Sequence, residues 1–164
     1  MTSGPFSLRR RILFLLPAAL GLAGAGPVQG ASLVLPVPES LQVALQLALR
    51  AGYPLTVMVS LEACPFCRVV RDSYLRSLFE EEMHAVVQID MRSSRAVRDF
   101  RGAATTHDEL VRAWNVQVAP TLLFIGPGAR EVAPRLVGAS IPDFYGGYLD
   151  DRIRTARASL KTSH

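Results

Sequence analysis

The strongest constraint on the fold is the apolar, β-branched run LTVMVSL at Leu55–Leu61, which lacks a polar face. A run of this kind is typical of a strand that is buried on both sides. Before it, leucines and alanines recur at helical spacing from Leu41 to Leu49, and Gly52 with Pro54 ends that pattern. A helix followed by a doubly buried strand predicts an α/β layer fold.

The rest of the chain continues the alternation of helical and strand patterns. Further strands are predicted at residues 32–36, 84–91, 119–125 and 131–138, and further helices at 68–83, 107–114 and 141–160. Pro134 predicts that the last strand lies at a sheet edge, and two consecutive strands before the final helix predict a mixed sheet. The predicted fold class is α/β, with a central mixed sheet flanked by helices. The final helix is expected to break near Gly146 and Gly147.

Several polar residues have no chemical role in this interpretation. The arginine-rich segment RSSRAVRDFRGAA, residues 92–104, is predicted to be a surface loop, and contact of its arginines with a partner is the alternative. His84 and His107 are expected at the surface or near a helix cap. Trp114, the only tryptophan, is expected to pack in the core.

The first 30 residues have the layout of a secretory signal peptide. Arg9, Arg10 and Arg11 precede an uncharged apolar run, Ile12–Val28, which ends near small residues, and cleavage is expected after Gly30. An uncleaved membrane anchor is the alternative, because the run is close to the shortest length that spans a bilayer. The three arginines also fit a loose twin-arginine export signal. Residues 31–164 are then a single exported domain, which places the protein in the periplasm.

The net charge of +4 comes mostly from this segment. Three of the 18 basic residues and none of the 14 acidic residues lie in residues 1–30, which leaves 15 basic residues against 14 acidic ones. Nucleic-acid binding is therefore not expected.

The two cysteines of the chain, Cys64 and Cys67, form the motif CPFC directly after the buried strand. If Cys64 caps the following helix, Pro65 occupies its first position, where a missing N–H has no cost. Unpaired N–H groups at the helix start favour the thiolate of Cys64, which attacks disulfides, and Cys67 then resolves the mixed disulfide. The sequence therefore predicts a redox-active dithiol.

Other uses of a CxxC motif fit less well. A zinc site needs four ligands, and a second cysteine pair is absent. A c-type haem site needs histidine where Arg68 stands. A purely structural disulfide would close a very small loop and constrain little. No metal and no organic cofactor are expected.

A second motif, VAPT at Val118–Thr121, precedes a long strand. Together with CPFC it resembles the thioredoxin superfamily over about Leu41 to Leu160. The resemblance implies a thioredoxin fold in which Pro120 is cis and lies beside the cysteines, as a catalytic residue with Cys64 and Cys67. It also implies that substrate contacts come from the residues that flank these motifs: Pro65, Phe66, Ala119 and Thr121.

Two details resemble periplasmic SoxW-like thioredoxins: Glu62 in LEACPFC, and the expansion formed by VRDFRG and TTHDELVRAWNV. Three positions depart from ordinary thioredoxins, which have an acid at Met58, a tryptophan at Ala63 and Gly-Pro between the cysteines. Glu62 is therefore a candidate proton acceptor, or else a solvated charge at the edge of a loop.

The resemblance implies an exported thiol–disulfide oxidoreductase that reduces disulfides of periplasmic proteins. Its partners would be protein disulfides or thiols and a membrane electron donor, and a monomer is expected. An oxidase of the DsbA type and a non-catalytic binding module with the same fold are the alternatives.

Overall fold

The computed structural model describes Met1 and residues 32–161, except residues 83, 140 and 141. The predicted signal peptide, residues 1–30, lies outside the described residues apart from Met1. Residues Ala31–His164 form one compact unit. Its elements, in chain order, are α1 (Leu41–Arg50), β1 (Leu55–Ser60), α2 (Pro65–Val69), η1 (Val70–Leu75), η2 (Ser77–Glu81), β2 (Val86–Asp90), β3 (Ala96–Arg98), β4 (Ala104–Thr106), α3 (His107–Ala113), β5 (Thr121–Gly126), η3 (Pro127–Ala129), β6 (Arg130–Val137) and α4 (Pro142–Lys161).

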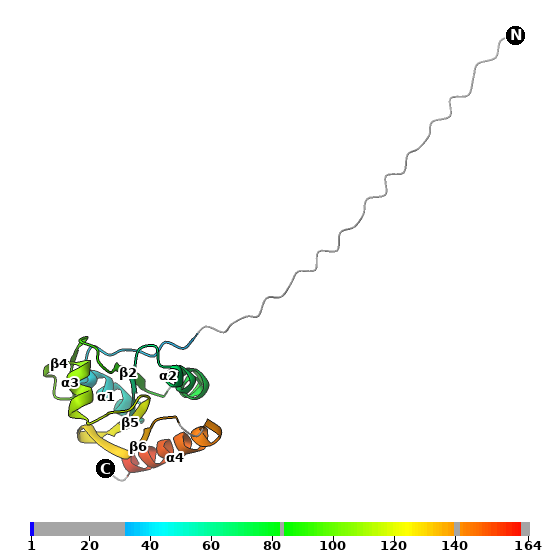
Figure 1. The fold of residues 1–164 in the computed structure, drawn as a ribbon. Coiled ribbons are helices and arrows are strands. Elements are labelled where there is room, and N and C mark those ends of the chain that lie inside the picture. Colours follow the sequence, from blue (N-terminus) through cyan, green and yellow to red (C-terminus); the bar gives the residue numbers. More distant parts are fainter. Residues whose placement is uncertain (2–31, 83, 140–141, 162–164) are drawn as a thin grey trace. The chain divides into compact units, whose positions relative to one another are not determined.

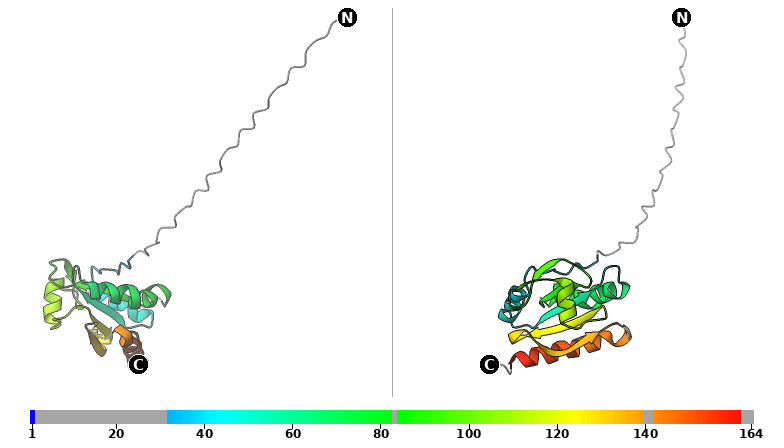
Figure 2. Two further views of the ribbon diagram at one scale, coloured as in Figure 1. Left: turned by 45° about the vertical axis from the view of Figure 1, so that its right-hand side comes forward. Right: turned by 60° about the vertical axis from the view of Figure 1, so that its left-hand side comes forward.

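Four of the strands form the central sheet, in the order β2-β1-β5-β6. β1 is parallel to β2 and antiparallel to β5, which is in turn antiparallel to β6. The predicted mixed sheet is confirmed, and Pro134 lies on β6 at its edge. Helices cover both faces, and Figures 1 and 2 show α4 running along one of them.

Alternate side chains of β1 and β5 enter two cores on opposite faces of the sheet, as the period of two requires. One core lies under α1 and α3 and contains Val57, Val59, Leu123 and Ile125. The other lies under α2, η1 and α4 and contains Met58, Cys67, Leu122 and Phe124. Because all six residues of β1 are buried, the predicted doubly covered strand is confirmed.

Residues 32–36 do not form the predicted strand. Leu33 and Leu35 are buried in the core under α2, but the segment has no regular secondary structure. It meets the edge of β2 where the Gln88 N–H donates to the Pro36 oxygen at 2.8 Å. Pro36 and Pro38 lack the N–H groups that a continuous ladder would need.

The predicted helix at 68–83 begins earlier, at Pro65, and changes character. After α2 the backbone forms two π-helical segments, η1 and η2, within 70–81. The spacing of apolar residues does not distinguish i→i+4 from i→i+5 bonding over such short segments, so the sequence pattern could not reveal this change.

Two other local predictions were wrong. The expected loop at 92–104 contains the short hairpin β3-β4, whose turn is closed by Asp99 Oδ1 accepting from the Arg101 and Ala103 N–H groups at 2.8 Å each. The expected break at Gly146 and Gly147 is absent, because α4 is continuous there. A Cβ at Gly146 would lie 3.7 Å from the Tyr74 ring, an ordinary contact distance, so the helix has room for a side chain there.

Among the described residues, none of the helices has the length and apolar character that a membrane span requires.

Candidate active site

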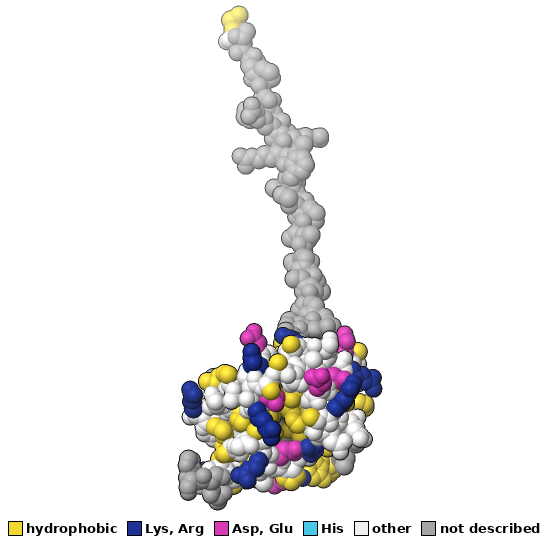
Figure 3. All heavy atoms as spheres, turned by 90° about the vertical axis from the view of Figure 1, so that its left-hand side faces the viewer, with side chains coloured by type: hydrophobic (Ala, Val, Ile, Leu, Met, Phe, Trp, Pro, Cys, Tyr) yellow, Lys and Arg dark blue, Asp and Glu magenta, His cyan; other side chains and the backbone are white. Residues whose placement is uncertain are grey.

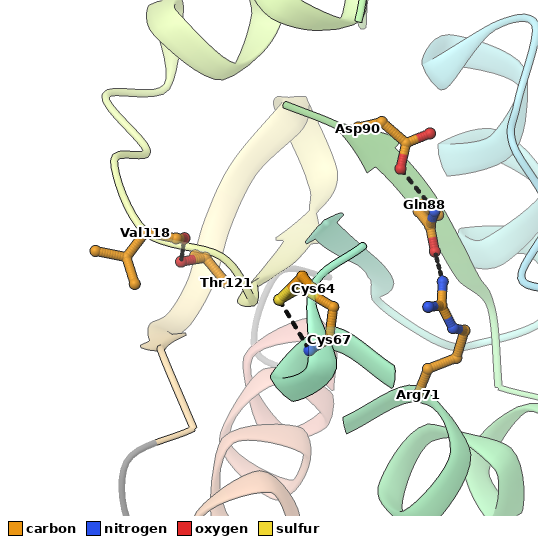
Figure 4. Close-up of a disulfide and its surroundings, with 7 residues drawn as sticks. All are labelled: Cys64, Cys67, Arg71, Gln88, Asp90, Val118 and Thr121. Atoms are coloured by element: carbon orange, nitrogen blue, oxygen red, sulfur yellow. Dashed lines mark hydrogen bonds between the residues drawn. A yellow bond between two sulfur atoms is a disulfide. The ribbon is translucent and has the colours of Figure 1, made fainter. Parts of the chain in front are cut away.

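The CPFC motif lies where β1 ends and α2 begins. Cys64 is the N-cap of α2 with extended backbone, Pro65 follows inside the first turn, and the Cys67 N–H donates to Cys64 Sγ at 3.1 Å. Cys64 and Cys67 form a disulfide (Figure 4). The predicted cap geometry is therefore present, and one backbone donor already points at the sulfur of Cys64.

The two sulfurs differ in their exposure. Cys67 is 0% exposed and belongs to the core that contains Met58 and Leu122, whereas Cys64 is only half-buried at the edge of that core. An incoming group can therefore approach Cys64 from solvent. Cys67 can react only with a sulfur already held at Cys64.

The VAPT segment lies beside the cysteines. The Ala119–Pro120 peptide bond is cis, and half-buried Ala119 packs against the same core as Cys64. Pro120 is buried, and its oxygen accepts from the Gly138 N–H at 2.7 Å, which ties the loop to the end of β6.

Thr121 does not occupy the exposed position that a direct substrate contact needs. It is 1% exposed, and its Oγ1 donates to the Val118 oxygen at 2.7 Å (Figure 4). Its hydroxyl therefore closes the turn that carries the cis bond. A substrate contact of Thr121 stays a prediction, and the observed role of its side chain is to position the segment that carries the cis bond.

Exposed apolar side chains lie on both segments that form the site. Phe66 is 61% exposed on α2, and Val118 is 47% exposed at the start of the VAPT segment. Pro65 is also exposed. These side chains leave apolar surface open to solvent on the segments that carry Cys64 and the cis bond.

A cleft of about 1020 Å³, lined by both polar and apolar groups, opens on the other side of Cys64. Its charged lining residues are Glu62, Arg68, Arg71, Asp90 and Arg92. Figure 4 shows a hydrogen-bond chain in this region: Arg71 Nη1 donates to Gln88 Oε1, and Gln88 Nε2 donates to Asp90 Oδ1, both at 2.6 Å. The cleft combines solvent access with both signs of charge next to the disulfide.

Met58 has no carboxylate that could accept a proton from Cys67. Met58 is fully buried in the core with Cys67, so β1 presents a thioether there and not a carboxylate. Glu62 is exposed and lines the cleft together with Cys64.

Sequence reasoning missed Arg71, Gln88, Asp90 and Arg92 as parts of the site. A usable signal existed, because Gln88 and Asp90 are polar residues two positions apart in an otherwise apolar strand. Their spacing places both on the face of β2 that also carries Val86, toward α2. Arg92 gave no such signal, because a turn brings it to the cleft.

Both histidine side chains are buried, so the expected surface positions are wrong, but His107 does lie next to a helix cap, directly after Thr106, the N-cap of α3. Nδ1 of His107 accepts the Asp90 N–H at 3.0 Å, so this nitrogen carries no proton although Asp90 Oδ2 lies 4.0 Å away. Burial lowers the pKa of His107, and the Asp90 charge only partly opposes that effect. His107 is therefore a neutral anchor for the end of β2. Trp114 packs, half-buried, against the core under α1 and α3.

Within the described part of the chain, no three His, Cys, Asp or Glu side chains are grouped as metal ligands would be.

Comparison with known proteins identifies the family. A model of the thioredoxin-like domain matches residues 41–152. None of the curated proteins compared with the chain matches it.

Among solved structures, a DsbH oxidoreductase shares the fold, with a TM-score of 0.50, 17% identity, and coverage of 84% of this chain and 92% of that one. A Thermus thermophilus thioredoxin has a TM-score of 0.48 and 23% identity, covering 74% of this chain and 86% of that one. Oxidised thioredoxin O2 from Arabidopsis thaliana has a TM-score of 0.48 and 17% identity, covering 71% and 93%. The fold and the close pair of cysteines fit a thiol–disulfide oxidoreductase, and the chain belongs to the thioredoxin-like family.

Proposed function

We propose that the protein is an exported thiol–disulfide oxidoreductase that reduces disulfides of periplasmic proteins. The observation that carries the proposal is the asymmetric cysteine pair, in which Cys64 is half-buried and lines the cleft whereas Cys67 is fully buried. The name of the DsbH oxidoreductase, which shares the fold, is consistent with this chemistry.

The reaction needs only the two cysteines and a substrate disulfide. The Cys64 thiolate attacks one substrate sulfur, and the other leaves as a thiolate that takes up a proton. Cys67 then loses its proton and attacks Cys64 Sγ, which releases the second substrate sulfur as a thiol. Two electrons pass to the substrate, and the protein is left with the Cys64–Cys67 disulfide.

Residues around Cys64 fit the binding of an extended, partly apolar protein segment. Phe66 and Val118 offer exposed apolar surface beside the sulfur, with Pro65 next to it. The backbone of Ala119, before the cis bond to Pro120, would pair with the substrate strand, as the family resemblance implies. Such pairing would hold the substrate disulfide in line with Cys64.

Glu62 is the proposed proton acceptor for the resolving step. Because Met58 supplies no carboxylate beneath Cys67, the proton must leave by another route. Glu62 shares the cleft with Cys64 and is open to water, which can relay the proton.

The cellular setting is proposed from the composition of residues 1–30, an arginine cluster followed by an apolar run. Export to the periplasm requires a source of electrons there, and a membrane-bound dithiol carrier would reduce the Cys64–Cys67 disulfide after each turnover. Neither a cofactor nor nucleic acid takes part, and the protein would act as a monomer. Basic and acidic side chains are interspersed over the face shown in Figure 3, which agrees with protein partners.

The deciding experiment is the equilibrium reduction potential of the Cys64–Cys67 pair, titrated against glutathione. A value below about −220 mV, on the thioredoxin side of the scale, supports a reductase. A value near about −120 mV would instead indicate an oxidase of the DsbA type. Failure of the pair to cycle between dithiol and disulfide would contradict both functions and leave a binding module.

A further inference from the structure

We propose that the cleft beside Cys64 recognises a carboxylate of an acidic segment next to the substrate's disulfide, through Arg68 and Arg92. This inference rests on the proposed function, since it names the class of protein disulfide that the site prefers. The cleft lies on the opposite side of Cys64 from the VAPT segment (Figure 4), so it adds a second point of contact.

Arg68 is placed beside the reactive sulfur by the helix itself. It lies one turn after Cys64, and its N–H donates to the Cys64 oxygen at 3.2 Å. Residues four apart share a helix face, so its guanidinium is carried on the side of α2 that carries Cys64. Both residues line the cleft.

Arg92 reaches the cleft from a loop that is fixed at several points. The Met91 N–H donates to the Ser60 oxygen at 2.8 Å, and the Arg92 N–H donates to Asp108 Oδ1 at 3.1 Å. The Asp108 N–H in turn donates to the Ser93 oxygen at 3.1 Å. These bonds join the loop to β1 and α3, so Arg92 presents its charge from a rigid base.

Both guanidinium groups are available for a ligand. Within the described residues, neither side chain has a hydrogen bond or an ion pair, and both residues are exposed. By contrast, six arginines elsewhere pair with carboxylates: Arg76, Arg112, Arg135, Arg152, Arg154 and Arg157. The unpaired guanidiniums are therefore free to bind a carboxylate brought by a partner.

Among the charged residues of the cleft, Arg68 and Arg92 are best placed to bind a carboxylate of the substrate. Arg71 is engaged by Gln88, which also holds Asp90, so these side chains form an internal chain. Glu62 lines the same cleft. Three cations against two anions favour an anionic group, and guanidinium forks match a carboxylate by two parallel hydrogen bonds.

The test compares three peptides that carry the same disulfide, flanked by two Glu, two Gln or two Lys residues. Their kcat/KM values are measured at low and high salt with the wild-type protein, with R68Q/R92Q, and with the control R101Q/R130Q. The control removes two exposed arginines that lie outside the cleft. Exposed surface substitutions of this kind leave the fold intact.

We expect the wild-type protein to prefer the Glu peptide over the Lys peptide by about tenfold at low salt, and less at high salt. R68Q/R92Q should lower kcat/KM about fivefold for the Glu peptide, leave the Gln peptide within about twofold, and abolish the salt dependence. The control should keep the wild-type preference.

Two outcomes would overturn the inference while leaving the proposed function intact. One is equal reduction of all three peptides by the wild-type protein. The other is an equal loss for all three in R68Q/R92Q, which would mean that the arginines act on the Cys64 thiolate and not on the substrate. If no peptide disulfide is reduced by any protein, the proposed function itself fails, and the inference fails with it.

Discussion

The two ends of β1 and β2 show opposite uses of arginine. At the carboxyl ends, Arg68 and Arg92 line an open cleft beside the disulfide without partners among the described residues. At the amino ends, Arg157 of α4 lies over the Tyr53 ring at 4.8 Å and 3.4 Å from both Glu82 Oε2 and His84 Nδ1. Arginine side chains therefore lack partners among the described residues at the carboxyl ends, whereas Arg157 has several partners at the amino ends.

The two ends differ in whether their charged groups are paired within the molecule. The amino end joins α4 to the starts of β1 and β2, and its charges are neutralised inside the molecule. Arginine can only donate, so His84 accepts at Nδ1 and carries its proton on the buried Nε2. The carboxyl end carries a reactive sulfur, and partners for its cations would have to come from another molecule. Arg157 therefore has a structural role, whereas Arg68 and Arg92 are distinguished from other unpaired arginines by their place in the cleft beside Cys64.

The largest expected effect comes from substituting the reactive cysteines at the carboxyl end of β1. Cys64→Ser should lower disulfide reduction by at least about 1000-fold, because a hydroxyl cannot replace the attacking thiolate. Cys67→Ser should keep the attack but trap the substrate as a mixed disulfide on Cys64, visible by mass spectrometry of the intact protein. A Cys64→Ser protein that still turned over would contradict the assignment of the nucleophile.

The second prediction concerns pH at the opposite end. Burial, with a smaller contribution from Arg157, lowers the pKa of His84 from 6.5 to about 4. The unfolded chain then binds more protons between these values, so the free energy of unfolding should fall as pH falls from 6.5 toward 4, by up to about 3 kcal/mol. Above pH 6.5 this contribution is fully present.

Urea unfolding across this pH range measures the effect. His84→Phe keeps a ring against Tyr53, which lies 5.2 Å away, and should flatten the slope. Part of the slope should remain, because the pKa of His107 is lowered as well. An unchanged slope in the variant would show that His84 is not the titrating group.

The third prediction concerns Arg157, the arginine with several partners at the amino ends of the strands. Arg157→Ala should lower the free energy of unfolding by about 1–2 kcal/mol, since it removes a cation–π contact and an ion pair. The matched control is Arg154→Ala on the same helix, whose more exposed side chain pairs only with Asp151 at 3.7 Å and should cost less than about 0.5 kcal/mol. The reduction potential should stay the same in both, and a shift in either variant would undo the separation of the two ends.

The smallest effect tests how the VAPT segment is held. Thr121→Val removes the hydrogen bond to the Val118 oxygen and should lower the free energy of unfolding by about 1 kcal/mol, with a modest loss of turnover. Thr56→Val is the control, because Thr56 is equally buried but its Oγ1 has no partner among the described residues. The control should be neutral or more stable by up to about 1 kcal/mol. Equal losses in the two variants would argue against a specific role for the Thr121 hydroxyl.

The fold was predictable where a pattern spans many residues. The apolar run at Leu55–Leu61 and the helical spacing from Leu41 onward gave β1 and α1, and their alternation gave the layered sheet. Prediction failed where tertiary contacts override a local preference. The two glycines of α4 stay helical between Tyr145 and Leu149, which are buried in the core, and 96–106 forms a hairpin because Val97 reaches the core.

The candidate site was likewise predictable only in part. The cysteine spacing and the proline after Cys64 were enough to place a capped dithiol at the start of a helix. The arginine cleft was not predictable, because Arg68 and Arg92 line the same cleft only after the end of β2 is tied to β1 and α3.

The sequence by itself determined the elements of the sheet, its mixed topology and the CPFC dithiol, because these follow from short-range spacing and residue chemistry. The tertiary structure alone decided how deeply each cysteine is buried, that both histidines are buried, and which arginines lack a carboxylate. These properties depend on which distant segments pack together, and burial and charge pairing are set by that packing.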